Sequence, residues 1–324
     1  MRAVVLREHG GPEVLTIEEV DDPVPGPDQI LVDVAHTALN RADTLQRQGG
    51  YPDPRRRDIE IPGLEYAGTV AALGDDVIEW QVGDRVMGIE AGGCYAGRIV
   101  THARQALPIP PHIELRDASA IPEVFLTAWD ALVVQGGLTS GRWALVHAGA
   151  SGVGTAGIQI AKAIGARIAV TCSAGKADAC RELGADLVLE RSPADWLGAL
   201  RAELPAGVDT ILDVVGGDEA DRNFKAVATD GTIVQVGLMG GGQAPVNMGL
   251  LLMKRITWIG TTLRARPLER KLELCQRFVH EILPLFESGA LAPVIDSRYS
   301  LDDIADAHRY MESNANVGKI LIDV

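Results

Sequence analysis

The chain has 324 residues, of which 47% are hydrophobic, and a formal net charge of −14 at pH 7. We expect two domains, because single hydrophobic cores stop growing at about 250–300 residues. The acidic balance argues against nucleic acid and anionic membranes as main partners, since phosphate-rich surfaces attract basic proteins. No apolar run reaches the about 18 residues of a membrane-spanning helix, and the N-terminus has too short an apolar stretch for a signal peptide. The four cysteines form no C-x-x-C pair, which predicts reduced thiols in a cytoplasmic protein.

Short apolar runs separated by turn residues fill the first 120 residues. Runs of this length with β-branched residues are typical of strands. We predict strands over Met1–Leu6, Gln29–Thr37, Gly68–Ala72, Asp84–Ile89 and Gly97–Thr101. Many short strands with glycine and proline between them predict a compact β barrel or sandwich.

From about residue 122 the pattern changes to alternating strands and helices. The predicted strands cover 143–148, 168–172, 186–189, 208–215 and 232–236, with a possible sixth at 256–262. The predicted helices cover 153–164, 175–183, 195–203 and 218–228. Apolar strands that alternate with helices predict an α/β fold with a parallel, doubly wound sheet covered on both faces.

The C-terminal part is expected to leave this sheet. Residues 266–288 predict one helix, with an apolar stripe that includes Leu272, Cys275 and Phe278. Lys319–Val324 has the composition of a strand, and we expect it to return to the N-terminal domain. The predicted organisation is a discontinuous β-rich catalytic domain, 1–121 and 264–324, and a nucleotide-binding domain, 122–263.

A glycine-rich turn after residues 143–148 is the most informative motif. Gly152-x-Gly154-x-x-Gly157 has the G-x-G-x-x-G spacing, with a predicted strand before it and a predicted helix after it. Backbone N–H groups at such a turn approach a pyrophosphate closely, and the helix dipole favours the negative charge. We therefore expect Ser151, Gly152, Val153 and Gly154 to hold the pyrophosphate. His147, just before the turn, is interpreted as a hydrogen-bonded core residue.

The next predicted strand indicates which nucleotide is bound. An NAD site carries Asp or Glu about 20 residues past the glycines, for the ribose 2′-OH. This chain has Ser173 there, followed by Lys176, and Arg191 comes after the third predicted strand. A hydroxyl and two cations suit a 2′-phosphate, which a carboxylate would repel. The pattern favours NADPH; the alternative is that both cations are solvated surface charges.

Nine segments, the glycine-rich turn among them, together resemble a known protein family over nearly the whole chain. They are Ala38–Asp43, Gln46–Gly49, Pro62–Gly68, Val82–Val86, Ala120–Glu123, Leu126–Ala128, His147–Gly154, Gly237–Gly242 and Asn316–Ile320. In this order they resemble the medium-chain dehydrogenase/reductase superfamily. Within it the chain is similar to the zinc-free NADPH:quinone oxidoreductases related to zeta-crystallin, and especially to the stress-inducible branch. The resemblance implies a Rossmann-type sheet and a GroES-like catalytic domain.

Zinc ligands of the superfamily are missing from this sequence. The zinc alcohol dehydrogenases place a Cys and a His where this chain has Asn40 and Leu64, and their four-cysteine lobe has no counterpart here. Without these ligands no Lewis acid polarises the substrate oxygen. We expect no metal.

The resemblance also implies a set of site residues. Asn40 and Tyr51 would lie beside the nicotinamide and donate hydrogen bonds to a substrate oxygen. Alternatively, Asn40 only caps a helix that begins at Arg41, and Tyr51 only packs in its turn. Glu65 is expected to be structural. Further cofactor contacts are implied for Thr127, Gly237, Leu238, Leu263 and Asn316. Lys176 matches the adenosine-phosphate site, whose usual Tyr is replaced by Arg191.

The predicted function is NADPH-dependent, zinc-independent reduction of quinones in a homodimer or tetramer that pairs through an edge strand near 256–262. One alternative is an NADPH-dependent enoyl reductase of enals, enones or acryloyl- or enoyl-CoA, for which Arg55, Arg56 and Arg57 would form a basic entrance. The other is a non-enzymatic structural or RNA-binding role, as in some zeta-crystallin relatives. The acidic charge and the intact glycine turn argue against this non-enzymatic role.

Overall fold

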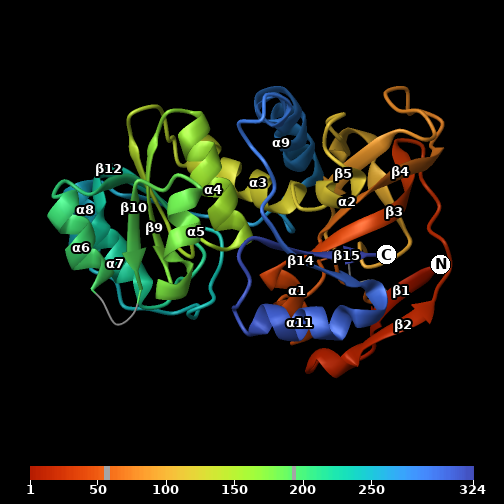
Figure 1. Cartoon of the computed structure of the whole chain (residues 1–324), viewed down its shortest axis with the longest axis horizontal. Helices are drawn as coiled ribbons and strands as arrows, with labels where there is room; N and C mark the ends of the chain where they lie inside the picture. The colour runs from red at the N-terminus through yellow and green to blue at the C-terminus, as the bar shows by residue number, and fades with distance from the viewer. Residues whose placement is uncertain (55–58, 192–194) are drawn as a thin grey trace. The chain divides into compact units, whose positions relative to one another are not determined.

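The computed structural model describes residues 1–54, 59–191 and 195–324. The chain forms two compact units (Figure 1). Unit 1 contains Met1–Leu126 and Leu263–Val324, and unit 2 contains Thr127–Thr262. No helix in the described part of the chain is long and apolar enough to cross a membrane.

Unit 2 is built on a six-stranded sheet with the order β10-β9-β8-β11-β12-β13. The strands are β8 Trp143–Val146, β9 Arg167–Cys172, β10 Leu187–Glu190, β11 Val208–Asp213, β12 Val227–Gln235 and β13 Thr257–Gly260. All five neighbouring pairs are parallel. The predicted doubly wound sheet is confirmed, including the sixth strand, which lies at its edge. The sheet runs outward from β8 in both directions, so the turns after β8 and β11 mark the reversal of strand order where such folds bind ligands.

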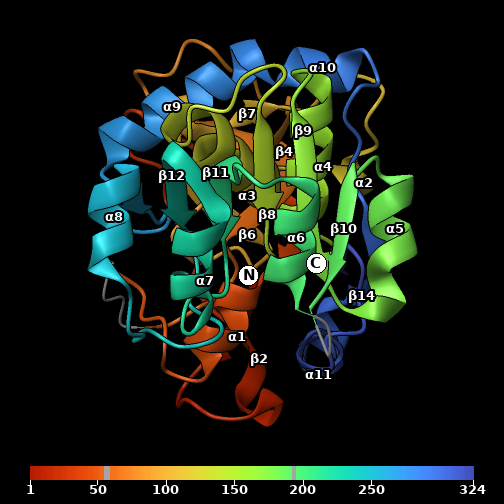
Figure 2. The same ribbon diagram turned by 90° about the vertical axis from the view of Figure 1, so that its left-hand side faces the viewer.

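Helices cover both faces of this sheet (Figure 2). They are α4 Gly152–Ala163, α5 Ala177–Glu182, α6 Trp196–Glu203, α7 Glu219–Ala226 and α8 Met248–Lys254. Trp196, Leu200 and Phe224 bury their side chains against apolar residues of the strands. The four predicted helices are present, whereas α8 was not predicted because its leucine- and methionine-rich sequence has no polar stripe.

Unit 1 contains a seven-stranded sheet with the order β14-β15-β3-β4-β5-β7, in which β6 also pairs with β3. The strands are β3 Gln29–Leu39, β4 Glu65–Leu73, β5 Arg85–Ile89, β6 Arg98–His102, β7 Leu107–Pro108, β14 Ile295–Ser300 and β15 Lys319–Asp323. β1 Arg2–Leu6 and β2 Leu15–Glu19 form a separate antiparallel pair. The C-terminal strand β15 pairs with β3, with Ile320 opposite Leu39.

The helices of unit 1 contradict one prediction, the one between residues 266 and 288. They are α1 Arg41–Arg47, α2 Leu115–Ala118, the start of α3 Pro122–Trp129, α9 Leu268–Glu281, α10 Leu283–Glu287 and α11 Ile304–Glu312. The single helix predicted over 266–288 is wrong, because the chain breaks at Ile282, where φ is −113°. Pro284 follows in the first turn of α10, the position where a missing N–H costs no hydrogen bond.

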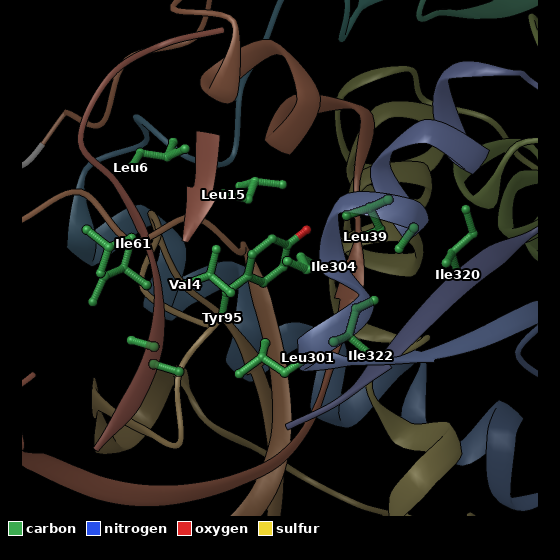
Figure 3. Close-up of a cluster of buried hydrophobic side chains, with 14 of the residues drawn as sticks. Val4, Leu6, Leu15, Leu39, Ile61, Tyr95, Leu301, Ile304, Ile320 and Ile322 are labelled. Atoms are coloured by element: carbon green, nitrogen blue, oxygen red, sulfur yellow. The ribbon is translucent and has the colours of Figure 1, made fainter. Parts of the chain in front are cut away.

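A cluster of buried side chains holds α11 and the β1–β2 pair against the C-terminal strand (Figure 3). Val4, Tyr95, Ile304 and Ile322 are all less than 3% exposed. Val4 and Ile322 are more than 300 residues apart in the sequence. This core therefore forms only when the C-terminal segment packs against the N-terminal strands. The cluster fixes Tyr95 and β15, which carry polar groups described below.

Candidate functional site

The turn after β8 is arranged as an anion site. Ala148 adopts the left-handed conformation with φ of 56°, and Ser151 then caps α4, its Oγ accepting a hydrogen bond of 3.1 Å from the Gly154 N–H. The first N–H groups of a helix have no carbonyl one turn earlier. Gly152 and Val153, the first two residues of α4, therefore present their N–H groups at the positive end of the helix dipole.

Two glycines of this turn are required by close packing. A Cβ on Gly149 would lie 2.5 Å from the Cβ of Val170 on β9. A Cβ on Gly154 would lie 2.4 Å from the carbonyl oxygen of Ala148. The motif therefore keeps the turn tight against its own backbone and against β9. The predicted residues Ser151 to Gly154 lie together in one helix start.

The predicted adenosine-phosphate residues lie at the ends of two neighbouring strands. β9 and β10 are parallel neighbours, and the Arg191 N–H donates to the Cys172 carbonyl at 2.9 Å. This bond places Arg191 beside Ser173, and Lys176 follows one turn later. Ser173 and Arg191 are exposed, and Lys176 is half-buried. Sequence reasoning missed Glu190, which lies opposite Cys172 and adds a carboxylate to this edge.

Gly237 and Leu238 follow β12, which is parallel to β11, so they lie at the same carboxyl edge as the glycine turn. The Gln235 side chain donates to the Gly237 carbonyl at 2.7 Å and fixes this segment. Leu238 is 55% exposed. His147 is buried and hydrogen-bonded at both ring nitrogens, to Thr171 Oγ1 at 2.9 Å and Asn223 Oδ1 at 2.7 Å. Its interpretation as a core residue is confirmed.

Unit 1 holds a buried polar cluster, which we call the Asn40 cluster: Asn40, Asp43, Glu65, Tyr95 and Lys319. Lys319 begins β15 and forms a 2.7 Å ion pair with Oε1 of Glu65, the first residue of β4. Its ammonium also donates to Asn40 Oδ1 and to the Leu39 carbonyl, both at 2.8 Å. Three acceptors therefore match the three protons of the ammonium.

The side chain of Asn40 is turned toward the strands. Its backbone N–H donates to Asp43 Oδ2 at 2.8 Å, so Asn40 occupies the N-cap position of α1. Its amide, however, donates to Glu65 Oε1 at 2.8 Å and accepts from Lys319. Asn40 is therefore the N-cap residue of α1, as the alternative predicted, and its side-chain atoms are bound by residues of β4 and β15.

Asp43 and Tyr95 form the buried end of the cluster. The Tyr95 hydroxyl donates to Asp43 Oδ2 at 3.1 Å, and the Gly63 N–H donates to Oδ1 at 3.3 Å. Burial raises the pKa of Asp43 to about 6, against the hydrogen bond from Asn40 and the charge of Lys319. Burial and the neighbouring Asp43 together hold the pKa of Tyr95 well above its usual value.

Glu123 lies at the start of α3 beside the cluster. Its backbone N–H donates to Glu65 Oε2 at 2.9 Å, so Glu65 binds Asn40 with one oxygen and Glu123 with the other. Burial is the main cause, and the charge of Glu65 the second, that raises the pKa of Glu123 to about 8. Sequence reasoning quoted Glu123 and Lys319 only as parts of motifs, because nothing near either residue in the sequence indicates a shared site.

Tyr51 is anchored through a buried arginine. Arg264 donates to the Tyr51 carbonyl, to the Ala91 carbonyl and to Gln46 Oε1 at 2.8–2.9 Å. Its guanidinium lies 4.9 Å from the centroid of the Tyr51 ring. Arg264 is 6% exposed, so these bonds are shielded from water. The Tyr51 turn is therefore held by backbone and ring contacts together.

The other predicted residues are more dispersed. Thr127 lies in α3 and is half-buried. Leu263 is buried, and so is Asn316, which donates to the Gly318 carbonyl at 2.9 Å. Leu263 and Asn316 contribute little exposed surface. Arg55, Arg56 and Arg57 lie outside the described residues.

The position that carries a zinc-ligating His in the zinc enzymes is apolar here. Leu64 is 2% exposed and belongs to the interior of unit 1. Within residues 1–54, 59–191 and 195–324, no group of three His, Cys, Asp or Glu side chains is placed to hold a metal. The predicted independence of zinc stays a prediction.

Comparison with known proteins gives a consistent set of relatives. Residues 26–111 match the alcohol dehydrogenase GroES-like domain, and residues 152–277 match the zinc-binding dehydrogenase family. The rat synaptic vesicle membrane protein VAT-1 homolog is 29% identical over 99% of this chain and 84% of its own length. Bovine quinone oxidoreductase-like protein 2 is 30% identical over 96% of this chain and 89% of its own. The structure of Escherichia coli quinone oxidoreductase complexed with NADPH has a TM-score of 0.91 and 29% identity, with 100% of both chains covered.

Proposed function

Because the chain belongs to the quinone oxidoreductase-like branch of the medium-chain dehydrogenase/reductase superfamily, we propose that it is a zinc-independent NADPH:quinone oxidoreductase. The observation that carries the choice of cofactor is the edge formed by Ser173, Lys176 and Arg191 after β9 and β10. A hydroxyl and two cations at one edge suit a phosphate dianion. The absence of an acid at position 173 supports NADPH over NADH.

The proposed roles of the cofactor residues follow from their chemistry. The N–H groups of Gly152 and Val153 would hold the pyrophosphate, in the turn that Ser151 and Gly154 close through their own hydrogen bond. The backbone at Gly237 and Leu238 would lie along the nicotinamide, with further contacts from Asn40, Thr127, Leu263 and Asn316. NADPH supplies the hydride when it is bound, and the protein orients the reactants and excludes water.

Asn40 and Tyr51 are proposed to orient the acceptor. Glu65 and Lys319 fix the Asn40 amide from both sides, which pre-organises it. The Asn40 Nδ2 donates to Glu65 Oε1 at 2.8 Å and, more weakly, to the Ala38 carbonyl at 3.4 Å. A quinone oxygen would replace the Ala38 carbonyl as the acceptor of the longer bond. The Tyr51 hydroxyl would supply a second donor, from a turn held by Arg264. Quinones accept hydride readily, so orientation and hydrogen-bond donors suffice for the hydride transfer itself.

A panel of acceptors tests this function. NADPH oxidation would be followed by the loss of reduced-nicotinamide absorbance with an ortho-quinone, a para-quinone, an enal, an enoyl-CoA and a simple aldehyde, all with EDTA present. The proposal predicts turnover of the quinones. Turnover of the C=C substrates alone would instead identify an enoyl reductase. NADPH binding without turnover of any acceptor would favour the non-enzymatic role.

We further propose a homodimer that pairs through β13, while a tetramer remains the larger alternative. β13 is the last strand of its sheet, and three of its four residues are exposed. Trp258 on this strand is 44% exposed, and Leu252 and Met253 on α8 are 78% and 72% exposed. An open strand edge beside exposed apolar side chains favours pairing with a second copy.

A further inference from the structure

Glu123 has a half-buried carboxyl group near the buried acids Glu65 and Asp43, and it forms no ion pair with any cation of the described residues. Its N–H is bound to Glu65, the carboxylate that also binds Asn40. The ammonium of Lys319 uses its three protons on Glu65, Asn40 and the Leu39 carbonyl. Lys319 therefore compensates Glu65 and has no proton left for a second carboxylate.

The groups around Glu123 come from four elements. Glu65 of β4 and Asp43 of α1 are acids, while Lys319 of β15 and Lys271 of α9 are cations. Lys271 donates to the Arg264 carbonyl at 3.0 Å. The Glu123 carboxyl itself makes no hydrogen bond to any residue in the described part of the chain, and it is half-buried. A carboxyl group in such surroundings is more stable as the neutral acid.

Two features make this acid suited to chemistry. Its pKa, raised to about 8, means that it holds a proton at neutral pH and can release it near the working pH. Its backbone N–H also binds Glu65, the carboxylate that holds the Asn40 amide, so Glu123 lies beside the amide proposed to bind the acceptor. Acids and bases whose pKa values are separated by their surroundings mark the proton-transfer groups of a site.

We propose that Glu123 is the general acid that protonates the acceptor oxygen. This rests on the proposed quinone reduction. Hydride addition gives the quinone two electrons and leaves one of its oxygens anionic. The O–H bond of Glu123 then breaks as the O–H bond of the hydroquinone forms, and water returns a proton to the Glu123 carboxylate. In sum, one quinone, one NADPH and one proton give one hydroquinone and one NADP⁺.

The substitution Glu123→Gln tests the proposal because it keeps the size of the side chain and the bond from the backbone N–H to Glu65. We expect kcat for quinones to fall about 100-fold, at the lower end of general-acid contributions, while KM for NADPH stays unchanged. Wild-type kcat should decline above about pH 8, following the pKa of Glu123, and the variant should lack this decline. Glu123→Asp, which keeps an acid with shorter reach, should restore part of the rate.

The exposed acid Glu114 provides the matched control, and Glu114→Gln should leave kcat and its pH profile unchanged. Infrared titration gives a readout without turnover: the carbonyl band of a neutral carboxylic acid should be lost near pH 8 in the wild type and be absent from Glu123→Gln. If Glu123→Gln keeps the wild-type rate and pH profile, the proton-donor role is overturned and the proposed function is not. The same holds if the wild type lacks the carbonyl band of a neutral acid that is lost near pH 8. A wild-type chain that oxidises no NADPH with any acceptor overturns the proposed function as well.

Discussion

At the scale of single residues, the polar chemistry of unit 1 depends on buried groups that must be compensated. Glu65 is fully buried and Lys319 is 3% exposed, so each would be costly without the other. Breaking a buried pair by removing one partner costs about 3–5 kcal/mol, whereas exposed pairs contribute about 0–1 kcal/mol. The Glu65–Lys319 pair therefore ties the orientation of Asn40 to the stability of the fold.

His308 should make the fold sensitive to acid. Burial, together with the charge of Arg47, lowers the pKa of this side chain from 6.5 to about 3. Below pH 6.5 the His308 side chain is protonated in the unfolded chain but stays neutral in the folded chain. The free energy of unfolding should therefore fall by about 1.4 kcal/mol per pH unit, down to about pH 3. The raised pKa of Asp43 acts with the opposite sign from about pH 6 downward.

Urea denaturation at a series of pH values from 6.5 downward measures this contribution. His308→Gln should lose the acid-dependent slope, and the exposed His112→Gln should keep it. Equal slopes in His308→Gln and the wild type would show that His308 takes up its proton in the folded chain.

The choice of cofactor also belongs to individual side chains. The double substitution Lys176→Ala with Arg191→Ala should raise KM for NADPH about 10- to 100-fold and leave KM for NADH nearly unchanged, because hydrogen bonds to charged groups contribute about 1.5–3 kcal/mol. Arg181→Ala removes a nearby exposed cation of α5 and should affect neither. Steady-state kinetics with both cofactors is the measurement, and equal effects on the two would contradict a 2′-phosphate site.

At the scale of elements, local patterns in the sequence predicted unit 2 well. Buried parallel strands are continuous apolar runs, and the glycine turn marks the start of α4, so β8 to β13 could be predicted with their order of appearance. The break between α9 and α10 was missed although Pro284 indicates it, because the apolar spacing continues through Ile282. β14 and α11 were not predicted, since their burial depends on contact with β15 and β1.

The candidate site could be predicted only where its residues are close in sequence. Ser151 to Gly154 lie in one turn, whereas Asn40, Glu65 and Lys319 meet through the pairing of β3 with β4 and β15. A lysine at the start of an apolar strand has no local signal that separates it from a surface charge. Long-range pairing, and not residue type, defines the Asn40 cluster.

The Tyr51 turn gives a test at this scale. Arg264→Ala removes three hydrogen bonds and the contact with the Tyr51 ring, so the turn should lose its fixed position. We expect kcat/KM for quinones to fall about 10- to 100-fold, as misplacement of an orienting group implies, with KM for NADPH little changed. Arg264→Lys, which cannot reproduce the three-way fork, should recover only part of the loss. Arg270→Ala, which removes an exposed arginine, is the control and should leave kcat/KM unchanged. A uniform rise of both KM values would contradict the positioning role.

At the scale of the whole molecule, the proposed dimer can be tested through its apolar surface. Leu252→Lys with Met253→Lys places two charges on α8, the helix that precedes β13 in the chain, and should convert a dimer into monomers. Size-exclusion chromatography with light scattering measures the mass directly. Ile78→Lys, at a 93% exposed position of unit 1, should leave the dimer intact. A wild-type chain that elutes as a monomer would contradict the proposed pairing.

The central claim is that this chain reduces quinones with NADPH and without a metal. The most direct measurement is the rate of NADPH oxidation by an ortho-quinone, with protein whose metal content has been removed by EDTA and checked by elemental analysis. We expect the metal-free protein to turn over as fast as the untreated protein and to prefer NADPH to NADH. Loss of the rate with EDTA and its recovery with Zn²⁺ would contradict the account, as would the absence of quinone turnover in both preparations.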